Sequence, residues 1–251
     1  MTPPSIEFAQ PRSPDLADCY FYHRMVLPDV GEVGQEWDLR AHVDDYLGHT
    51  DFAGRRVLEI GPASGFLTAH MERAGADVVS IDLPVDYGWD HVPRPGFGAD
   101  WLAERRRHME RLHSGFWFTH AKLGLKSKMI YSRVQDLPAS LGPFDVSVIA
   151  SVLIHCRDPM GVLCRCAELT GKRIVVSEAI WGRIGAPIPV MALMPSPNDS
   201  NSDCWWVIPP VTVATMLQVL GFTKTTVAEH QQFQWPTKRW IPCYTVVAER
   251  P

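Results

Sequence analysis

The chain has 251 residues, of which 46% are hydrophobic and 21% are charged, and its formal net charge is −4 at pH 7. This balance is typical of a soluble globular protein, and the acidity provides no basic field that would draw nucleic acid or anionic membrane to it. The first residues lack the basic and apolar regions of a signal peptide, and no apolar run approaches about 18 residues, so a cytoplasmic location is expected.

Six cysteines are scattered through the sequence and form no C-x-x-C pair. We interpret them as small buried residues in a reducing compartment. The densest group of metal-ligand residue types, from His155 to Cys166, has a spacing that matches no zinc signature. No metal site is therefore predicted.

Residues 1–50 are interpreted as an N-terminal arm followed by a cap helix. The arm is rich in proline, an aromatic stretch follows at 19–28, and apolar residues then recur at helical spacing over 37–47. We expect this segment to pack against the ligand site, with Tyr22 and His23 contacting an acceptor molecule. The alternative is a helix that caps the sheet edge and contacts no ligand.

The stretch from residue 56 to residue 82 has the pattern of a nucleoside-binding half-site. A short apolar run over 56–60 predicts a buried strand, which is followed by the turn Gly61-Pro62-Ala63-Ser64-Gly65. Helical spacing then continues to about Ala74, and a second buried strand over 77–82 ends in an acid. Strand, glycine turn, helix, strand and terminal acid together start a Rossmann-like unit.

The turn and the second acid suit a particular nucleoside. Gly61 and Gly65 carry no Cβ atom and let a ligand approach the main chain, and Asp82, about 20 residues on, can accept hydrogen bonds from both ribose hydroxyls. The carboxylate of Glu59 would face a pyrophosphate unfavourably but would suit a cationic amino-acid moiety, directly or through water. S-adenosylmethionine (SAM) carries such a moiety. On these residues the chain resembles the class I SAM-dependent methyltransferases.

The resemblance implies a SAM site at the carboxyl ends of the predicted strands. In this family the loop after the third strand lies beside the adenine, often with an acidic side chain on its exocyclic amine. Arg133 stands at that place here, so backbone contacts around Val134 and Gln135 are expected. The residues expected to contact SAM are Glu59, Gly61, Pro62, Gly65, Asp82, Leu83, Val134, Gln135 and Ser151.

Strands and helices alternate from residue 55 to residue 178, which predicts a parallel sheet wound on both faces. A long helix is expected over 99–123, and its run of three arginines is interpreted as a solvated face, with contact to a phosphate-bearing acceptor as the alternative. Asp158 is expected to cap a further helix that begins at Pro159.

The remaining third of the chain predicts a lid and a closing hairpin. Residues 180–210 are irregular and rich in proline, which is typical of a functional lid. A helix over 211–220 and strands over 222–229 and 244–249 follow, joined by a loop that contains the aromatic residues 233, 235 and 240. The predicted fold of residues 51–251 is thus α/β: a Rossmann-like, doubly wound, mostly parallel seven-stranded sheet with an antiparallel C-terminal hairpin.

Three stretches narrow the resemblance. Residues 36–40, 151–159 and 205–209 are similar to the tRNA wobble-uridine carboxymethyltransferase group and its relatives. Members that modify tRNA usually have an aromatic residue before the histidine of the second stretch, where this chain has Ile154, and the net acidity also argues against nucleic acid. The resemblance therefore implies the fold and the cofactor SAM but not the substrate.

His155 is the preferred catalytic base, because it follows the fourth strand, beside the expected sulfonium, and histidine titrates near neutral pH. The alternative is that it donates to a backbone carbonyl and only shapes the pocket. Tryptophans are concentrated in the irregular segments and can line an apolar or aromatic acceptor pocket. Together with Tyr22 and His23, the residues expected there are Trp205, Trp206 and Trp240.

The leading hypothesis is a SAM-dependent methyltransferase that acts on a small molecule with an apolar or aromatic part, with secondary metabolism as the expected setting. Two alternatives stay open. An aromatic cage could fold the methionine chain of SAM for an intramolecular displacement that releases methylthioadenosine, or the protein could modify a wobble uridine of tRNA. A small-molecule acceptor is the expected partner, no membrane partner is expected, and a homodimer is allowed.

Overall fold

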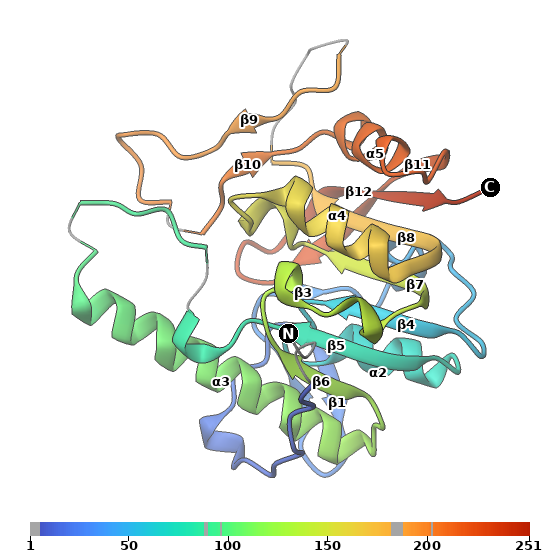
Figure 1. Ribbon diagram of the computed structural model, residues 1–251. Helices are drawn as coiled ribbons and strands as arrows, with labels where there is room; N and C mark the ends of the chain where they lie inside the picture. The colour runs from blue at the N-terminus through green and yellow to red at the C-terminus, as the bar shows by residue number, and fades with distance from the viewer. Residues whose placement is uncertain (1–5, 88–89, 96, 182–187, 202) are drawn as a thin grey trace, which may run out of the picture.

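A mixed sheet forms the centre of the computed structural model, which describes residues 6–87, 90–95, 97–181, 188–201 and 203–251 (Figure 1). Five neighbouring strands of this sheet are parallel, and the other three each run antiparallel to the next strand. The strand order is β3 (Trp37–Asp38), β11 (Lys224–Gln234), β12 (Arg239–Glu249), β8 (Thr170–Ala179), β7 (Phe144–Ala150), β4 (Arg56–Ile60), β5 (Asp77–Asp82) and β6 (Lys128–Tyr131).

The predicted doubly wound sheet with an antiparallel hairpin is confirmed, with one difference. The sheet has eight strands in the described part of the chain and not seven, because the two-residue strand β3 adds to one edge. The chain runs from β4 to β5 and β6 on one side and then returns to β7 and β8 on the other. Ligands of open α/β sheets bind where the strand order reverses in this way, so the carboxyl ends of β4 and β7 mark the expected site.

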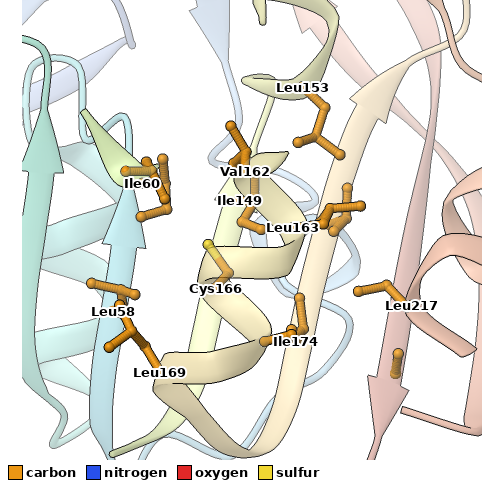
Figure 2. Close-up of a cluster of buried hydrophobic side chains, with 14 of the residues drawn as sticks. Leu58, Ile60, Ile149, Leu153, Val162, Leu163, Cys166, Leu169, Ile174 and Leu217 are labelled. Carbon is orange, nitrogen blue, oxygen red and sulfur yellow. The ribbon is translucent and has the colours of Figure 1, made fainter. Parts of the chain in front are cut away.

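Alternating side chains of the strands build a core on each face of the sheet. Leu58 and Ile149 point to α4 (Pro159–Leu169) and α5 (Pro210–Val219), whose buried side chains include Leu163 and Leu217 (Figure 2). Val57 and Val148 point to the opposite face, where α1 (Val43–Tyr46) and α2 (Phe66–Arg73) pack. Burial on both faces explains why the parallel strands have almost continuous apolar sequences.

Two helices match their predictions closely. The long helix α3 (Ala99–Leu123) has the predicted bounds, and its buried Trp117 packs with Met129 of β6. Helix α4 begins at Pro159, as predicted, and the Asp158 carboxylate accepts a hydrogen bond from the Gly161 N–H at 2.8 Å. The start of α4 follows a local rule, since proline in the first turn and an acidic N-cap residue favour a helix start.

The predicted helix over 37–47 is wrong for most of its length. Trp37 forms strand β3 and pairs with Gln234 of β11, and only the four residues of α1 are helical. Before β3, the short strands β1 (Met25–Leu27) and β2 (Gly31–Val33) form a small antiparallel pair. The free edge of β11 offers backbone partners from a distant part of the sequence, and this pairing overrides the local helical periodicity.

The C-terminal hairpin is longer than predicted. Strands β11 and β12 pair over all eleven residues of each, from Lys224 with Glu249 to Gln234 with Arg239. Phe233 and Trp240, predicted to lie in a loop, are therefore a cross-strand pair with ring centroids 5.4 Å apart. Aromatic cross-strand pairs stabilise a sheet, which explains why the strands continue to the turn.

The predicted lid contains the short strands β9 (Ala192–Leu193) and β10 (Trp206–Val207), which form an antiparallel pair. Its residues 182–187 and 202 lie outside the described residues. Over the parts of the chain that the structure describes, none of the helices is both long and apolar enough to cross a membrane.

Candidate functional site

A cavity of about 420 Å³ lies at the carboxyl ends of the parallel strands. One part, which we call the strand-end half, is lined by residues that follow β4, β5, β6 and β7: Gly61, Ala63, Asp82, Leu83, Val134 and Ser151. The other part, the cap half, is lined by residues of the N-terminal segment, of α3 and of the lid: Tyr20, Tyr22, Glu36, Trp37, Arg105 and Asp203. His155 lines the cavity as well.

The glycine turn has the conformation that its sequence predicts. Gly61 has φ +70°, and a Cβ atom built on it would lie 2.7 Å from Cγ2 of Val152. Gly65 has φ +84° and directly precedes α2, so it shapes the turn but is not among the residues that line the cavity. Pro62 is not among them either, whereas Ala63 is. Gly61 and Ala63 are therefore the residues of the turn that a ligand can approach.

Asp82 ends β5 and faces the cavity. One carboxylate oxygen accepts a hydrogen bond from the Leu83 N–H at 2.8 Å, and burial raises the pKa of the group to about 7. The other oxygen lies 3.7 Å from Nε2 of His113 on α3. His113 is a neighbour that sequence reasoning missed, because nothing in the local pattern of α3 shows which strand end it faces.

Glu59 lies behind the turn and does not line the cavity. One of its carboxylate oxygens accepts hydrogen bonds from the hydroxyls of Thr68 and Ser80, each at 2.6 Å. Burial raises the pKa of this carboxyl to about 7. The group thus connects β4 to α2 and β5 and fixes the base of the glycine turn.

The loop after β6 borders the strand-end half at the predicted place. Val134 and Gln135 lie in a short 3-10 helix, η3 (Val134–Asp136), and both line the cavity. Arg133 also lines the cavity and lies 3.8 Å from the carboxylate of Asp136. Its charge is balanced within its own turn.

His155 lies in the 3-10 helix η5 (Leu153–His155), directly after β7. Its Nδ1 atom lies 2.5 Å from the backbone oxygen of Asp203, so Nδ1 carries the hydrogen that is donated. Burial lowers the pKa of the imidazole, which leaves Nε2 as the unprotonated nitrogen at neutral pH. Glu178 supports the same turn from behind, since its Oε1 atom accepts from the Leu153 N–H at 2.8 Å.

The N-terminal segment crosses the glycine turn. The backbone N–H of Tyr22 donates to Oγ of Ser64 at 3.0 Å, and that of His23 lies 3.4 Å from the same atom. Both predicted residues, Tyr22 and His23, line the cavity. Two further lining residues, Glu36 and Tyr46, were not predicted as site residues from the sequence. The hydroxyl of Tyr46 lies 2.7 Å from Oγ of Ser151.

The three tryptophans predicted for an acceptor pocket are not among the residues that line the cavity. The indole N–H groups of Trp205 and Trp206 donate to the backbone oxygens of Asp90 and Cys156, respectively, and so hold the lid against the neighbouring loops. Trp240 is 47% exposed and packs against His42 and Phe233.

All six cysteines are free. Three of them are buried and the other three are partly exposed, so the interpretation as buried residues is confirmed for Cys19, Cys166 and Cys243 only. Within the described ranges, no group of three or more His, Cys, Asp or Glu side chains is placed to hold a metal ion.

The chain matches no known family model. It is 26% identical over 214 residues to a tRNA U34 carboxymethyltransferase of Azotobacter vinelandii, which covers 80% of this chain and 58% of that protein. It is 31% identical over 117 residues to a ubiquinone biosynthesis O-methyltransferase of Bordetella avium, which covers 46% of this chain and 38% of that protein. The chain thus spans less than two thirds of the length of these relatives.

Among solved structures, the chain is similar to the magnesium protoporphyrin IX methyltransferase of Synechocystis PCC 6803 with bound S-adenosylhomocysteine (SAH). The TM-score is 0.53 at 14% sequence identity, over 85% of this chain and 82% of the other. The fold is that of the class I SAM-dependent methyltransferases. The resemblance read from the glycine turn and Asp82 is confirmed.

Proposed function

We propose that this protein is a SAM-dependent methyltransferase that methylates a small molecule with an apolar or aromatic part. One observation carries the proposal: the turn at Gly61, the carboxylate of Asp82 and the loop at Val134 open onto one cavity where the strand order reverses. This is the place at which folds of this class bind a nucleoside. The similarity to proteins named as methyltransferases supports the same reaction class.

The residues of the strand-end half fit SAM. The Asp82 carboxylate would accept hydrogen bonds from the ribose hydroxyls, and the backbone around Val134 and Gln135 would border the adenine. The amino-acid moiety would lie beside the main chain of Gly61, which lines the cavity. When bound, SAM supplies the methyl group on its positively charged sulfur.

The cap half suits a small acceptor. Its walls include the aromatic side chains of Tyr20, Tyr22 and Trp37, which can pack against an apolar or aromatic acceptor. His155 borders the same space, and its unprotonated Nε2 would accept the proton that a hydroxyl or amine loses during methylation. The backbone oxygen of Asp203 holds the ring in this tautomer. In this arrangement, the hydrogen bond from Nδ1 to the backbone carbonyl keeps the hydrogen on Nδ1, so that Nε2 would be the nitrogen that accepts a proton.

Calorimetric titration with SAH tests the proposed function. We expect binding in the micromolar to submillimolar range, and a loss of affinity of about 100-fold in Asp82→Ala, because hydrogen bonds to a charged group contribute about 1.5–3 kcal/mol each. Asp77→Ala is the matched control, since Asp77 is an exposed acid at the opposite end of β5. If SAH binds both variants as tightly as the unaltered protein, the proposal is wrong.

One observation favours a second candidate, a tRNA-modifying enzyme: the similarity to the tRNA U34 carboxymethyltransferase covers 80% of this chain. Salt-sensitive retardation of tRNA in a native gel would support that candidate, because phosphate contacts weaken as the salt concentration rises. Release of methylthioadenosine from SAM without an acceptor would instead support the intramolecular displacement. Chromatography of the products formed from SAM separates that displacement from methyl transfer, because methyl transfer releases SAH and the displacement releases methylthioadenosine.

A further inference from the structure

Glu36 places a carboxylate in the cap half of the cavity. It lies between β2 and β3, and its backbone is held on both sides: its N–H donates to the oxygen of Tyr22 at 3.0 Å, and its oxygen accepts from the N–H of Trp235 at 2.7 Å. Oε1 accepts a hydrogen bond from the hydroxyl of Tyr20 at 2.5 Å. The carboxylate is thus fixed in position by the surrounding fold.

No lysine or arginine of the described residues forms an ion pair with Glu36. The other three carboxylates of the cavity wall each have a cationic partner or an expected ligand. Asp90 lies 3.2 Å from the guanidinium of Arg157, Asp203 lies 3.4 Å from that of Arg105, and Asp82 is the expected ribose ligand. Glu36 is therefore a cavity carboxylate whose charge has no cationic partner among these side chains.

Aromatic side chains line the same half of the cavity as this carboxylate. Tyr20, Tyr22 and Trp37 all line the cavity, and Tyr22 is joined to Glu36 through the backbone. The ring of Tyr20 lies 4.7 Å from that of His108, and burial lowers the pKa of His108, so this imidazole adds no positive charge at neutral pH. A fixed carboxylate beside aromatic faces is the environment that binds an organic ammonium group, by a charge-assisted hydrogen bond and cation–π contacts.

We propose that the acceptor carries an ammonium group, and that the Glu36 carboxylate binds it among the rings of Tyr20, Tyr22 and Trp37. The inference rests on the proposed function, because it names the substrate class of the same cavity. The ammonium group is the recognition element and does not fix which atom is methylated. The amino group of SAM is also an ammonium group, so the experiment has to distinguish binding of the acceptor from binding of SAM at Glu36.

The test uses three probes of similar shape with SAH-saturated protein at pH 7.5: 2-phenylethylamine, 2-phenylethanol and 3-phenylpropanoate. Dissociation constants are measured by ligand-observed NMR. We expect the amine to bind at least about 10-fold more tightly than the alcohol, which corresponds to one charge-assisted interaction. In Glu36→Gln this difference should disappear while the affinity for SAH stays within about twofold, since the amide still accepts from Tyr20.

Two further variants keep the result interpretable. Tyr20→Phe removes the hydroxyl but leaves the carboxylate, so the preference for the amine should persist. Glu32→Gln alters an exposed acid of the same segment that is already paired with Arg24 and Arg40, and it should leave the preference unchanged.

Several outcomes would overturn the inference. Equal binding of amine and alcohol, or a preference that survives in Glu36→Gln, would show that the carboxylate recognises no ammonium group. Tightest binding of the propanoate would identify Arg105 as the recognition group instead. A loss of SAH affinity of 10-fold or more in Glu36→Gln would assign the carboxylate to the amino group of SAM. If SAH does not bind the unaltered protein, the proposed function fails, and the amine titration without SAH then tests Glu36 alone.

Discussion

The two halves of the cavity are built in different ways. Every residue of the strand-end half lies at the end of a parallel strand or a few positions after it, so the sheet itself places Gly61, Asp82 and Val134. The cap half combines the N-terminal segment, α3 and the predicted lid, which are joined by contacts such as those of Tyr20 with the Arg111 backbone and of Arg105 with Asp203. The comparison teaches that the strand order places the proposed SAM site, whereas the proposed acceptor space depends on long-range docking of separate segments.

His155 stands where the two halves meet, and its substitution gives the largest effect expected within the cap half. We expect His155→Gln to lower turnover about 100-fold or more at pH 7.5, because a positioned base contributes about 100- to 10,000-fold. SAH affinity should stay within about twofold, since the strand-end half is unchanged. The measurement is the rate of SAH release with an acceptor that the unaltered protein methylates.

The control is His49→Gln, which alters a histidine that is 72% exposed. Unchanged turnover in His155→Gln would mean that the imidazole only shapes the pocket. A marked loss of SAH affinity would show that the two halves are not separable in this way.

The same contrast explains how far the sequence could be interpreted. The glycine turn, the acid at the end of β5 and the bounds of α3 follow from local patterns of apolar spacing, glycine and caps. The placement of Glu36 depends on β3, whose pairing with β11 joins residues nearly 200 positions apart. Periodicity carries no information about such a partner, so the helix predicted there was wrong.

The tryptophans show the same limit from the other side. Trp205 and Trp206 lie in the irregular segment predicted as a lid, yet their indole groups donate to neighbouring backbone oxygens, and neither residue is among those that line the cavity. An irregular segment has no fixed periodicity, so the sequence does not indicate which way a side chain points. The concentration of tryptophans in irregular segments favoured a ligand contact, whereas the hydrogen bonds of these indole groups hold the segment to its neighbours.

Three buried carboxyl groups lie on strands β4, β5 and β8, and their ionisation predicts a second effect. Burial raises the pKa of Glu178 to about 8 and those of Glu59 and Asp82 to about 7. These values lie above the ordinary ones, so the folded protein binds more protons than the unfolded chain up to about pH 8. Its stability should therefore fall as the pH rises.

Between pH 6.5 and pH 8 we expect the free energy of unfolding to decrease by roughly 3 kcal/mol, about half of it due to Glu178. The lowered pKa values of His23 and His113, about 3 and about 4, act in the opposite direction up to the unfolded histidine pKa near 6.5, so they offset roughly 1 kcal/mol or less of this decrease at the lower end of the window. Urea unfolding at the two pH values measures the difference.

Glu178→Gln should remove the share of the pH dependence that is due to Glu178, because an amide does not titrate in this range. The variant should still fold, since its amide oxygen can accept from the Leu153 N–H. Glu168→Gln, at a side chain that is 62% exposed, is the control. A pH dependence that persists unchanged in Glu178→Gln would show that this carboxyl is ionised in the folded protein. Glu59 and Asp82 would then be the groups responsible.

Asn201 gives the smallest expected effect and isolates the contribution of the lid. Its side-chain oxygen accepts from the N–H groups of Asp203 and Cys204, each at 3.1 Å, and its amide donates to the oxygen of Cys204 at 2.8 Å. These bonds fix the turn that presents the Asp203 oxygen to Nδ1 of His155. Asn201 is thus a positioning residue, which acts on the histidine without touching the reacting atoms.

Asn201→Ala should lower turnover about 3- to 10-fold, because hydrogen bonds contribute about 1 kcal/mol each and the turn keeps its other contacts. The more specific readout is the tautomer of His155, measured by NMR of protein labelled with ¹⁵N-histidine. In the unaltered protein the hydrogen should be on Nδ1, and in Asn201→Ala a share of it should move to Nε2. Asn198→Ala, at an exposed position of the same loop, should change neither quantity. If the hydrogen stays on Nδ1 in Asn201→Ala, the turn held by Glu178 orients the base without the lid, and the histidine then belongs to the strand-end half.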